Sequence, residues 1–240
     1  RAECVPVATA LGAAAARNPN SSLVNADHTW IALHILHEKR LGSSALDHRK
    51  EHLALFPQLP EILLSWSARD LEALHGSRWQ EATKQRMVEV MTDYHKLVAE
   101  LGPSIVADLG LDADGYTWAR QVVQQLGVHF VAPDGTPMLL VAPGLELLAP
   151  DEDVPPSTSG ARLEFTAGSH PTLVLYATMQ YGPGDAVALS HGGLACSSGH
   201  RLLTCGQMLE ANPFETVEIT LKIPVVPESL SAKANPFETV

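Results

Sequence analysis

Hydrophobic residues recur at helical spacing between residues 24 and 127, which predicts a set of helices in this half of the chain. The first helix is expected to begin at Asn25 or Asp27, because either side chain can accept hydrogen bonds from the free amides of a first turn. Gly42, followed by two serines, is expected to end it. Its apolar face is formed by Trp30, Leu33, Leu36 and Leu41.

A second helix is indicated by Ser67 and Asp70, which have the spacing of a capping box. Leu71 and Leu74 would supply its buried face, and Gly76 would end it. A longer helix follows and is expected to stop at Gly102 and Pro103, and a further helix is expected over residues 116–126. The predicted buried face of the long helix comprises Val88, Met91, Tyr94, Val98 and Leu101.

After Gly127 the pattern changes to short runs of β-forming residues separated by Pro and Gly. Because helices come first and strands later, the chain is expected to have an α+β architecture and not alternating βαβ units. Residues 151–160 are polar and read as a loop. The predicted strands cover residues 138–141, 162–165, 172–177, 186–190 and 217–223.

Composition limits the possible partners of the chain. Its 240 residues are 45% hydrophobic and 18% charged, which suffices for one large domain or two small ones. The net charge of -11 disfavours binding to nucleic acid and is compatible with a basic protein partner. No apolar run approaches the roughly 20 residues that a membrane span needs. Three cysteines without a CxxC pair favour a reducing compartment.

The heptapeptide that begins at Ala211 recurs letter for letter from Ala234 to Val240. Seven identical residues do not arise by chance, but a single short repeated segment does not make a solenoid repeat. A recent duplication or an assembly artefact is the simplest interpretation. The second copy is expected to form a loose C-terminal tail.

Two histidine patterns raise the possibility of metal chemistry. His48 and His52 fit the H-x-x-E-H spacing of some zinc peptidases, and His34 and His37 lie one helical turn apart. A charged helical turn and a partly buried hydrogen-bonded pair explain them more simply, so no metal site is expected. Asp112 to Gly115 fails as a calcium loop because Gly110 and Gln121 occupy ligand positions.

Five blocks, in order, resemble SET-domain proteins of the type that methylates lysine in the large subunit of Rubisco. Each block is weak alone, but their order and spacing extend over about residues 24 to 222. The blocks are the helix from Trp30 to Gly42, Leu59 to Glu61 with Trp66 to Gly76, Trp118 with Ala119, Leu140 to Leu148, and Tyr181 to Gly192 with Asn212 and Pro213.

This resemblance implies small twisted sheets with a large helical insert and S-adenosylmethionine as methyl donor. It also shows substitutions at the family's chemical positions. His191 stands where the family has the tyrosine of the lysine channel, and would be the catalytic residue of an active protein. Glu146, Ala149 and Pro150 stand at cofactor-binding positions, and Ala149 and Pro150 replace an Asn-His pair. Gln125 and Leu126 replace a Ser-Arg pair, and the glycine-rich strand-turn that cradles the cofactor is not found.

The pattern therefore predicts an N-terminal segment at 1–23, an insert-like helical segment at 24–127, a SET-like β region at 128–225 and a tail at 226–240. The leading hypothesis is a non-catalytic interaction subunit of a larger assembly, without a cofactor and with other protein subunits as partners. The rival is an S-adenosylmethionine-dependent protein-lysine methyltransferase, and an unrelated α+β binding module is the third reading. An intracellular location is expected, in a plastid, another organelle or the cytoplasm.

Overall fold

The computed structural model of the chain describes residues 27–42, 47–131, 135–142, 144–150, 160–166, 172–189 and 197–206, together with residues 208, 212, 214 and 215. The expected N-terminal segment, the predicted strand at 217–223 and the C-terminal copy of the heptapeptide lie outside these residues. Among the described residues, no helix is long and apolar enough to cross a membrane.

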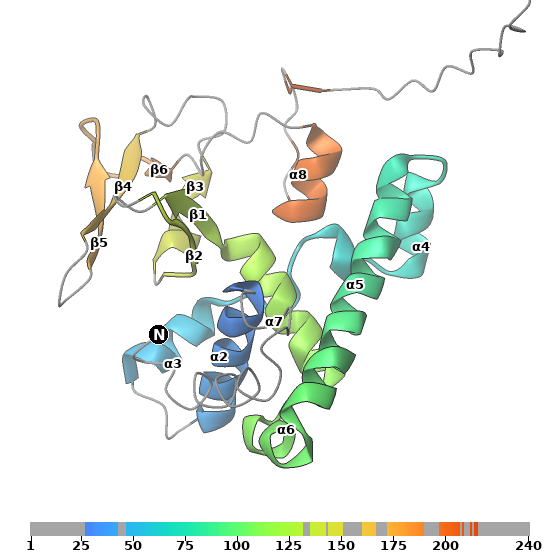
Figure 1. Cartoon of the computed structure of the whole chain (residues 1–240). Coiled ribbons are helices and arrows are strands. Elements are labelled where there is room, and N and C mark those ends of the chain that lie inside the picture. The colour runs from blue at the N-terminus through green and yellow to red at the C-terminus, as the bar shows by residue number, and fades with distance from the viewer. Residues whose placement is uncertain are drawn as a thin grey trace, which may run out of the picture.

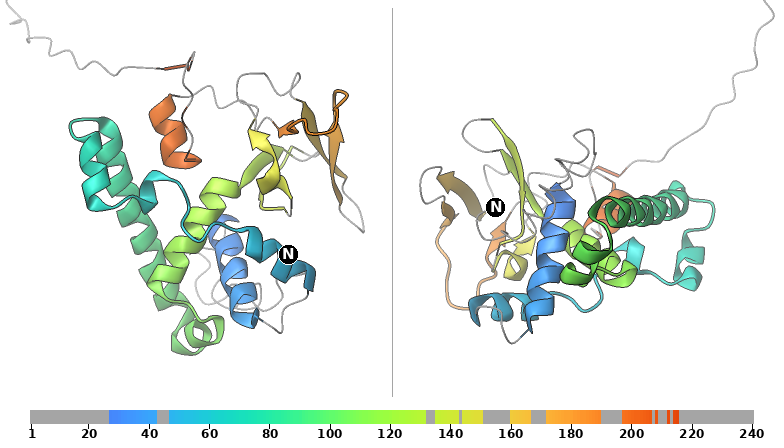
Figure 2. Two further views of the ribbon diagram at one scale, coloured as in Figure 1. Left: turned by 180° about the vertical axis from the view of Figure 1, so that it is seen from behind. Right: turned by 60° about the horizontal axis from the view of Figure 1, so that its bottom comes forward.

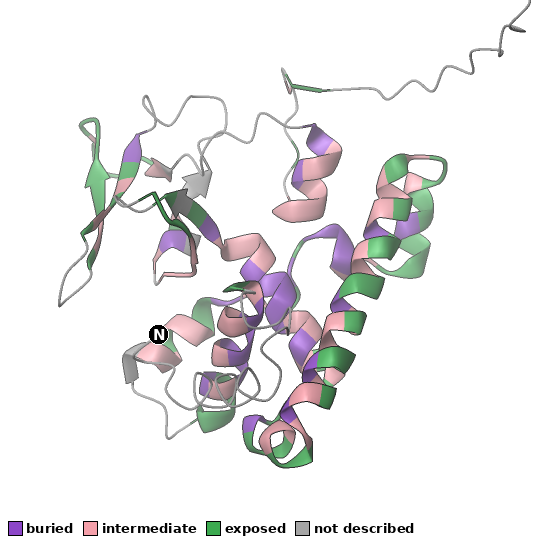
Figure 3. Ribbon diagram, viewed as in Figure 1, coloured by how far each residue is buried: buried purple, intermediate pink, exposed green. Residues whose placement is uncertain are grey.

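The first part of the described chain is helical (Figure 1). Helices α2 and α7 pack against each other, and α5 packs along α7. Their contact is the main core, which contains Leu33, Leu97, Tyr116 and Val122 at 0% exposure. Figure 3 shows this buried seam in the middle of the helical part. The elements are α2 (Asp27–Leu41), α3 (Asp47–Leu55), η3 (Leu63–Ser65), α4 (Ala68–Leu71), η4 (Glu72–Leu74), α5 (Arg78–Leu101), α6 (Pro103–Leu109) and α7 (Ala113–Leu126).

Two small sheets follow the helices, and Figure 2 shows them on one side of the helical part. The first is an antiparallel pair of β1 and β2, and the second has the strand order β3-β6-β4-β5. A second, smaller core contains Val128, Leu145 and Ala161. The remaining elements are β1 (Val128–Val131), β2 (Pro137–Leu140), η5 (Leu145–Leu147), β3 (Ala149–Pro150), β4 (Ala161–Thr166), β5 (Thr172–Ala177), β6 (Ala188–Leu189) and α8 (Ser198–Thr204).

The predicted α+β class and the change from helix to strand after Gly127 are confirmed, since α7 ends at Leu126 and β1 begins at Val128. The strand predicted at 172–177 coincides with β5, whereas β6 is shorter than predicted. Strand β1 was not predicted, because four residues are too few for a periodic signal and pairing with β2 completes them. The division into domains stays a prediction.

The predicted buried face of α5 was wrong at Val88, which is 65% exposed. Leu101 is buried as predicted, and Val90 and Leu97, which were not predicted, are buried as well, because the neighbouring helices select the face that is covered. Pro103 does not only end α5. It also opens α6, a helix that was not predicted, because the first turn of a helix tolerates proline.

The predicted cap at Ser67 is confirmed. Its Oγ accepts a hydrogen bond from the amide of Asp70 at 3.2 Å, and the Asp70 carboxylate accepts one from the Ser67 hydroxyl at 2.7 Å. Asp112 caps α7 in the same manner, since its Oδ1 accepts from the amide of Gly115 at 2.7 Å. The Asp112 to Gly115 segment is therefore a helix start, consistent with the rejection of a calcium loop.

Candidate functional site

The candidate site is built around two short parallel strands, β3 and β6. Ala149 pairs with Ala188, and Pro150 pairs with Leu189. Leu189 also pairs with Ala161 of β4, so β6 lies between β3 and β4 in the four-stranded sheet. The structure thus brings together the ends of two sequence blocks that are separated by about forty residues. His191, with Ser190 and Gly192, follows β6 directly but lies outside the described residues.

Glu146 lies on η5, the single turn that leads into β3. The turn begins at Gly144, whose φ of 89° places it in the left-handed region that glycine adopts without strain. Leu145 anchors the turn in the smaller core at 8% exposure. Of Glu146, Ala149 and Pro150 the structure describes the backbone, which places all three within five residues of chain next to β6.

The C-terminal end of α7 leads into β1 and carries Gln125 and Leu126. Leu126 packs against the main core, as an apolar side chain at a helix end would. The Oε1 atom of Gln125 is buried and has no hydrogen-bond partner among the described residues. This position therefore offers the neutral amide of Gln125, whose oxygen accepts and whose NH2 group donates, and an apolar side chain, but no cation.

Beside this junction, the imidazole of His28 on α2 lies against that of His129 on β1, with ring centroids 5.8 Å apart. Burial of the ring, together with the electrostatic effects of Arg120, His129 and Arg86, outweighs the opposing effect of Asp27 and lowers the pKa of His28 to about 4. The His28 ring is therefore neutral in the folded protein at neutral pH, and its protonation opposes folding.

We expect the free energy of unfolding to fall as the pH is lowered from about 6.5 to 4, with His28 contributing about 1 kcal/mol. In this window the unfolded chain binds a proton at the ordinary histidine pKa, whereas the folded chain does not. The contribution is complete above pH 6.5. Denaturant titrations at several pH values should show that His28→Gln flattens the profile, whereas His75→Gln, at an exposed position, does not. Equal pH profiles for His28→Gln and the unmodified chain would contradict this assignment.

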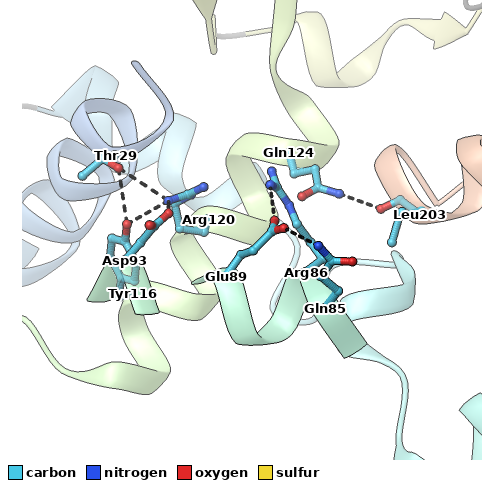
Figure 4. A network of polar contacts seen from close by, with 9 residues as sticks. All are labelled: Thr29, Gln85, Arg86, Glu89, Asp93, Tyr116, Arg120, Gln124 and Leu203. Carbon is cyan, nitrogen blue, oxygen red and sulfur yellow. Dashed lines mark hydrogen bonds and ion pairs between the residues drawn. The ribbon is translucent and has the colours of Figure 1, made fainter. Parts of the chain in front are cut away.

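A buried polar network that sequence reasoning missed connects α2, α5 and α7 (Figure 4). The Arg120 guanidinium donates to the Tyr116 hydroxyl at 2.9 Å and forms an ion pair with Asp93 at 3.3 Å. Thr29 lies 3.4 Å from the same tyrosine oxygen. One sequence feature could have indicated this network: Arg120 lies among apolar residues of α7, one helical turn after Tyr116. The network joins three helices of the scaffold and is adjacent to His28.

The histidines of the metal hypothesis lie on α2 and α3. His34 Nδ1 is 4.0 Å from the buried carboxylate of Glu38, which also forms an ion pair with Arg49. The ring of His52 packs edge-on against Phe56, with centroids 4.6 Å apart. Among the side chains that the structure describes, which do not include that of His48, no three His, Cys, Asp or Glu converge as metal ligands.

These features together define a SET-like α+β fold, with a helical part, two small sheets and a parallel pair of short strands at one end of the four-stranded sheet. Neither a scan against protein-family models nor a search of curated protein sequences finds a match. Solved structures do match. The SET domain of LSMT bound to lysine and AdoHcy superimposes with a TM-score of 0.65 at 16% identity, covering 86% of this chain and 44% of that one.

Two further structures give the same result. The SET domain of LSMT bound to methyllysine and AdoHcy has a TM-score of 0.64 at 17% identity, over 84% of this chain and 45% of that one. Rubisco LSMT bound to sinefungin and monomethyllysine has a TM-score of 0.60 at 18% identity, over 83% and 44%. The chain spans less than half the length of these structures. The resemblance found in the sequence is confirmed at the level of the fold.

Proposed function

We propose that this chain is a SET-like protein that has lost methyl transfer and serves as a structural or interaction subunit of a larger protein assembly. The observation that carries the proposal is the β3–β6 pair. It puts Ala149 and Pro150 on the edge strand of the four-stranded sheet, beside β6, at the positions where the resemblance expects an Asn-His pair that holds the cofactor. A fold retained without its chemical groups is typical of a scaffold.

The residues at this site do not fit S-adenosylmethionine. The amino-acid end of the cofactor carries a carboxylate, which requires hydrogen-bond donors. Alanine has no donor in its side chain, proline has no backbone N–H, and Leu126 cannot supply the charge of the family's arginine. The Gln125 amide can donate through its NH2 group, but it is neutral and does not replace the charge of the arginine. Losing several positioning groups together removes most transition-state stabilisation.

Exposed apolar side chains in the β region support the interaction half of the proposal. Leu147 is 70% exposed, Val131 68% and Met179 59%, and Leu175 and Tyr176 are also exposed. Large exposed apolar residues on neighbouring elements favour contact with another protein. The net charge of -11 favours a partner with a basic surface over nucleic acid. The compartment in which this assembly works stays a prediction.

The rival function is a protein-lysine methyltransferase in which His191 acts in place of the tyrosine. It is favoured by one observation, the TM-score of 0.65 to a SET domain that was solved with lysine and AdoHcy. His191 comes two residues after the end of β6 in the sequence, at the place along the chain where the resemblance puts the tyrosine. A histidine side chain can accept a hydrogen bond but is shorter than a phenol.

Isothermal titration with S-adenosylmethionine and with AdoHcy tests the proposal. We expect no saturable binding, meaning a Kd weaker than about 1 mM, because the side-chain amide, the backbone N–H and the cation that the resemblance expects around the carboxylate are replaced. LSMT, titrated in parallel, is the positive control. His191→Ala is the matched variant and should behave as the unmodified chain. A micromolar Kd for either ligand would refute the loss of the cofactor.

The rival function predicts a different set of results. Labelled methyl groups would pass from the donor to a protein target, and His191→Ala would abolish the transfer. A far-UV spectrum and a melting temperature equal to those of the unmodified chain would show that His191→Ala folds. Transfer that depends on His191 would replace the proposed function with the enzymatic one.

A further inference from the structure

The outer edge of β5 has an unusual combination of properties. In the described part of the sheet β5 pairs with β4 and has no strand on its other side. Figure 1 and Figure 2 show the β4–β5 hairpin projecting at the periphery of the molecule, away from the helices. Natural edge strands are blunted by charged residues, prolines or bulges. The sequence of β5, Thr-Leu-Val-Leu-Tyr-Ala, contains no charge and no proline.

The register of the hairpin shows which backbone groups of β5 point outward. The amide of Thr178 donates to the carbonyl of Gly160 at 3.0 Å, so these two residues form a hydrogen-bonded pair. Such pairs alternate along an antiparallel ladder. Arg162 with Tyr176 and Glu164 with Val174 are then hydrogen-bonded pairs as well. The N–H and C=O groups of Leu173, Leu175 and Ala177 consequently point away from β4.

The outward N–H and C=O groups of these three residues are arranged so that they can pair with the same groups of a second copy, with Leu175 at the centre. When two copies of β5 run antiparallel about a two-fold axis, Leu175 lies opposite the same residue of the other copy. Leu173 then lies opposite Ala177 in both directions, so every outward backbone group finds a partner. A leucine opposite an alanine on either side of the axis avoids crowding, and the uncharged strand places no like charges opposite each other.

Side-chain burial favours the same arrangement. Leu175 is 39% exposed and is paired with Leu163, which packs on the smaller core together with Leu173. A second β5 would extend this apolar face and cover Leu175. We propose that the β5 edge is a homodimer interface, in which two copies of the chain join their sheets by antiparallel β5–β5 pairing centred on Leu175.

Isologous pairing of this kind uses one patch on both subunits, and it does not depend on whether the chain binds a methyl donor. Each chain carries a net charge of -11, so the two copies repel at long range. Salt screens this repulsion but not the backbone hydrogen bonds or the apolar contact. The dimer is therefore expected to become tighter as the salt concentration rises, unlike a complex held by ion pairs.

Charge variants at the two-fold axis provide the test, with sedimentation equilibrium of the full chain as the measurement. The unmodified chain should have twice the mass of one chain and dissociate on dilution. Leu175→Lys and Leu175→Glu should each be monomeric, because like charges meet at the axis. An equimolar mixture of the two variants should restore the dimer, because opposite charges then meet. Val88→Lys, at a 65% exposed position on α5, is the control and should remain dimeric.

The backbone groups of Leu175 point away from β4, so the hairpin keeps its hydrogen bonds in Leu175→Lys and Leu175→Glu. Equal melting temperatures of the monomeric forms will show that both variants fold. A monomeric unmodified chain at all concentrations would overturn the proposal, as would a dimer that persists in Leu175→Lys. Failure of the mixture to associate would overturn the Leu175-centred register. Capture of an extended segment of another protein by a monomeric chain would assign the edge to a different partner.

Discussion

Replacing Arg120 with alanine is expected to lower the free energy of unfolding by about 3 kcal/mol. The guanidinium is 7% exposed and is the only group of the network in Figure 4 that contacts Thr29, Asp93 and Tyr116 at once. Its loss leaves buried hydroxyls with fewer partners and opens a cavity between α2, α5 and α7. Equilibrium unfolding in denaturant measures the effect.

Arg86→Ala is the matched control for this prediction. Arg86 lies on α5 and forms an ion pair with Glu89 at 3.0 Å, but the side chains are 36% and 46% exposed. A solvent-exposed pair of this kind contributes about 0.5 kcal/mol at most. If Arg120→Ala costs no more than Arg86→Ala, the buried network does not stabilise the helical part, and α2 and α7 are held by apolar contacts alone.

The second large effect is expected at Gly206, which follows α8. Its amide donates to the carbonyl of Arg201 at 3.0 Å, and its φ is 75°. A Cβ atom at this position would lie 1.8 Å from the backbone oxygen of Glu61, which no rotamer change relieves. Gly206→Ala should therefore cost about 3 kcal/mol, the sum of left-handed strain and a steric clash that pushes α8 away from η3.

Gly76→Ala separates these two contributions. Gly76 has a similar φ of 79°, but nothing lies within 4 Å of the position of a Cβ atom there. It should cost about 1 kcal/mol, from backbone strain alone. Thermal and denaturant unfolding of both variants give the difference. Equal costs at the two glycines would show that α8 adjusts freely, and that the close approach to Glu61 does not hold it in place.

Much of the secondary structure could be predicted, because its causes are local. The cap at Ser67 acts within three residues of chain, and the periodicity changes at Gly127 where the structure changes from helix to strand. The SET-like fold could be predicted from short blocks in a fixed order, and the similarity to solved SET domains confirms it. The sequence also shows that alanine has no side-chain donor and proline no backbone N–H, and the loss of the family's Asn-His pair at Ala149 and Pro150 stays a prediction from the resemblance.

Other features could not be predicted, because their partners are far apart in the chain. Local periodicity does not tell which side of α5 is covered, so Val88 was misplaced and Val90 was missed. Thr29 and Arg120 are 91 positions apart, and only the packing of α2 on α7 brings them together. The free edge of β5 likewise depends on which strand pairs with it and in which register.

By itself, then, the sequence determined most of the helices, most of the strands and the fold to which they belong, and it showed that Ala149 has no side-chain donor and Pro150 no backbone N–H. Each of these follows from the chemistry of a residue and its near neighbours. Only the tertiary structure decided that Pro150 lies beside Leu189, that Arg120 is buried and that the backbone groups of Leu173, Leu175 and Ala177 point away from β4. The reason is physical: burial and strand pairing are properties of two surfaces in contact, and one stretch of chain specifies only one of them.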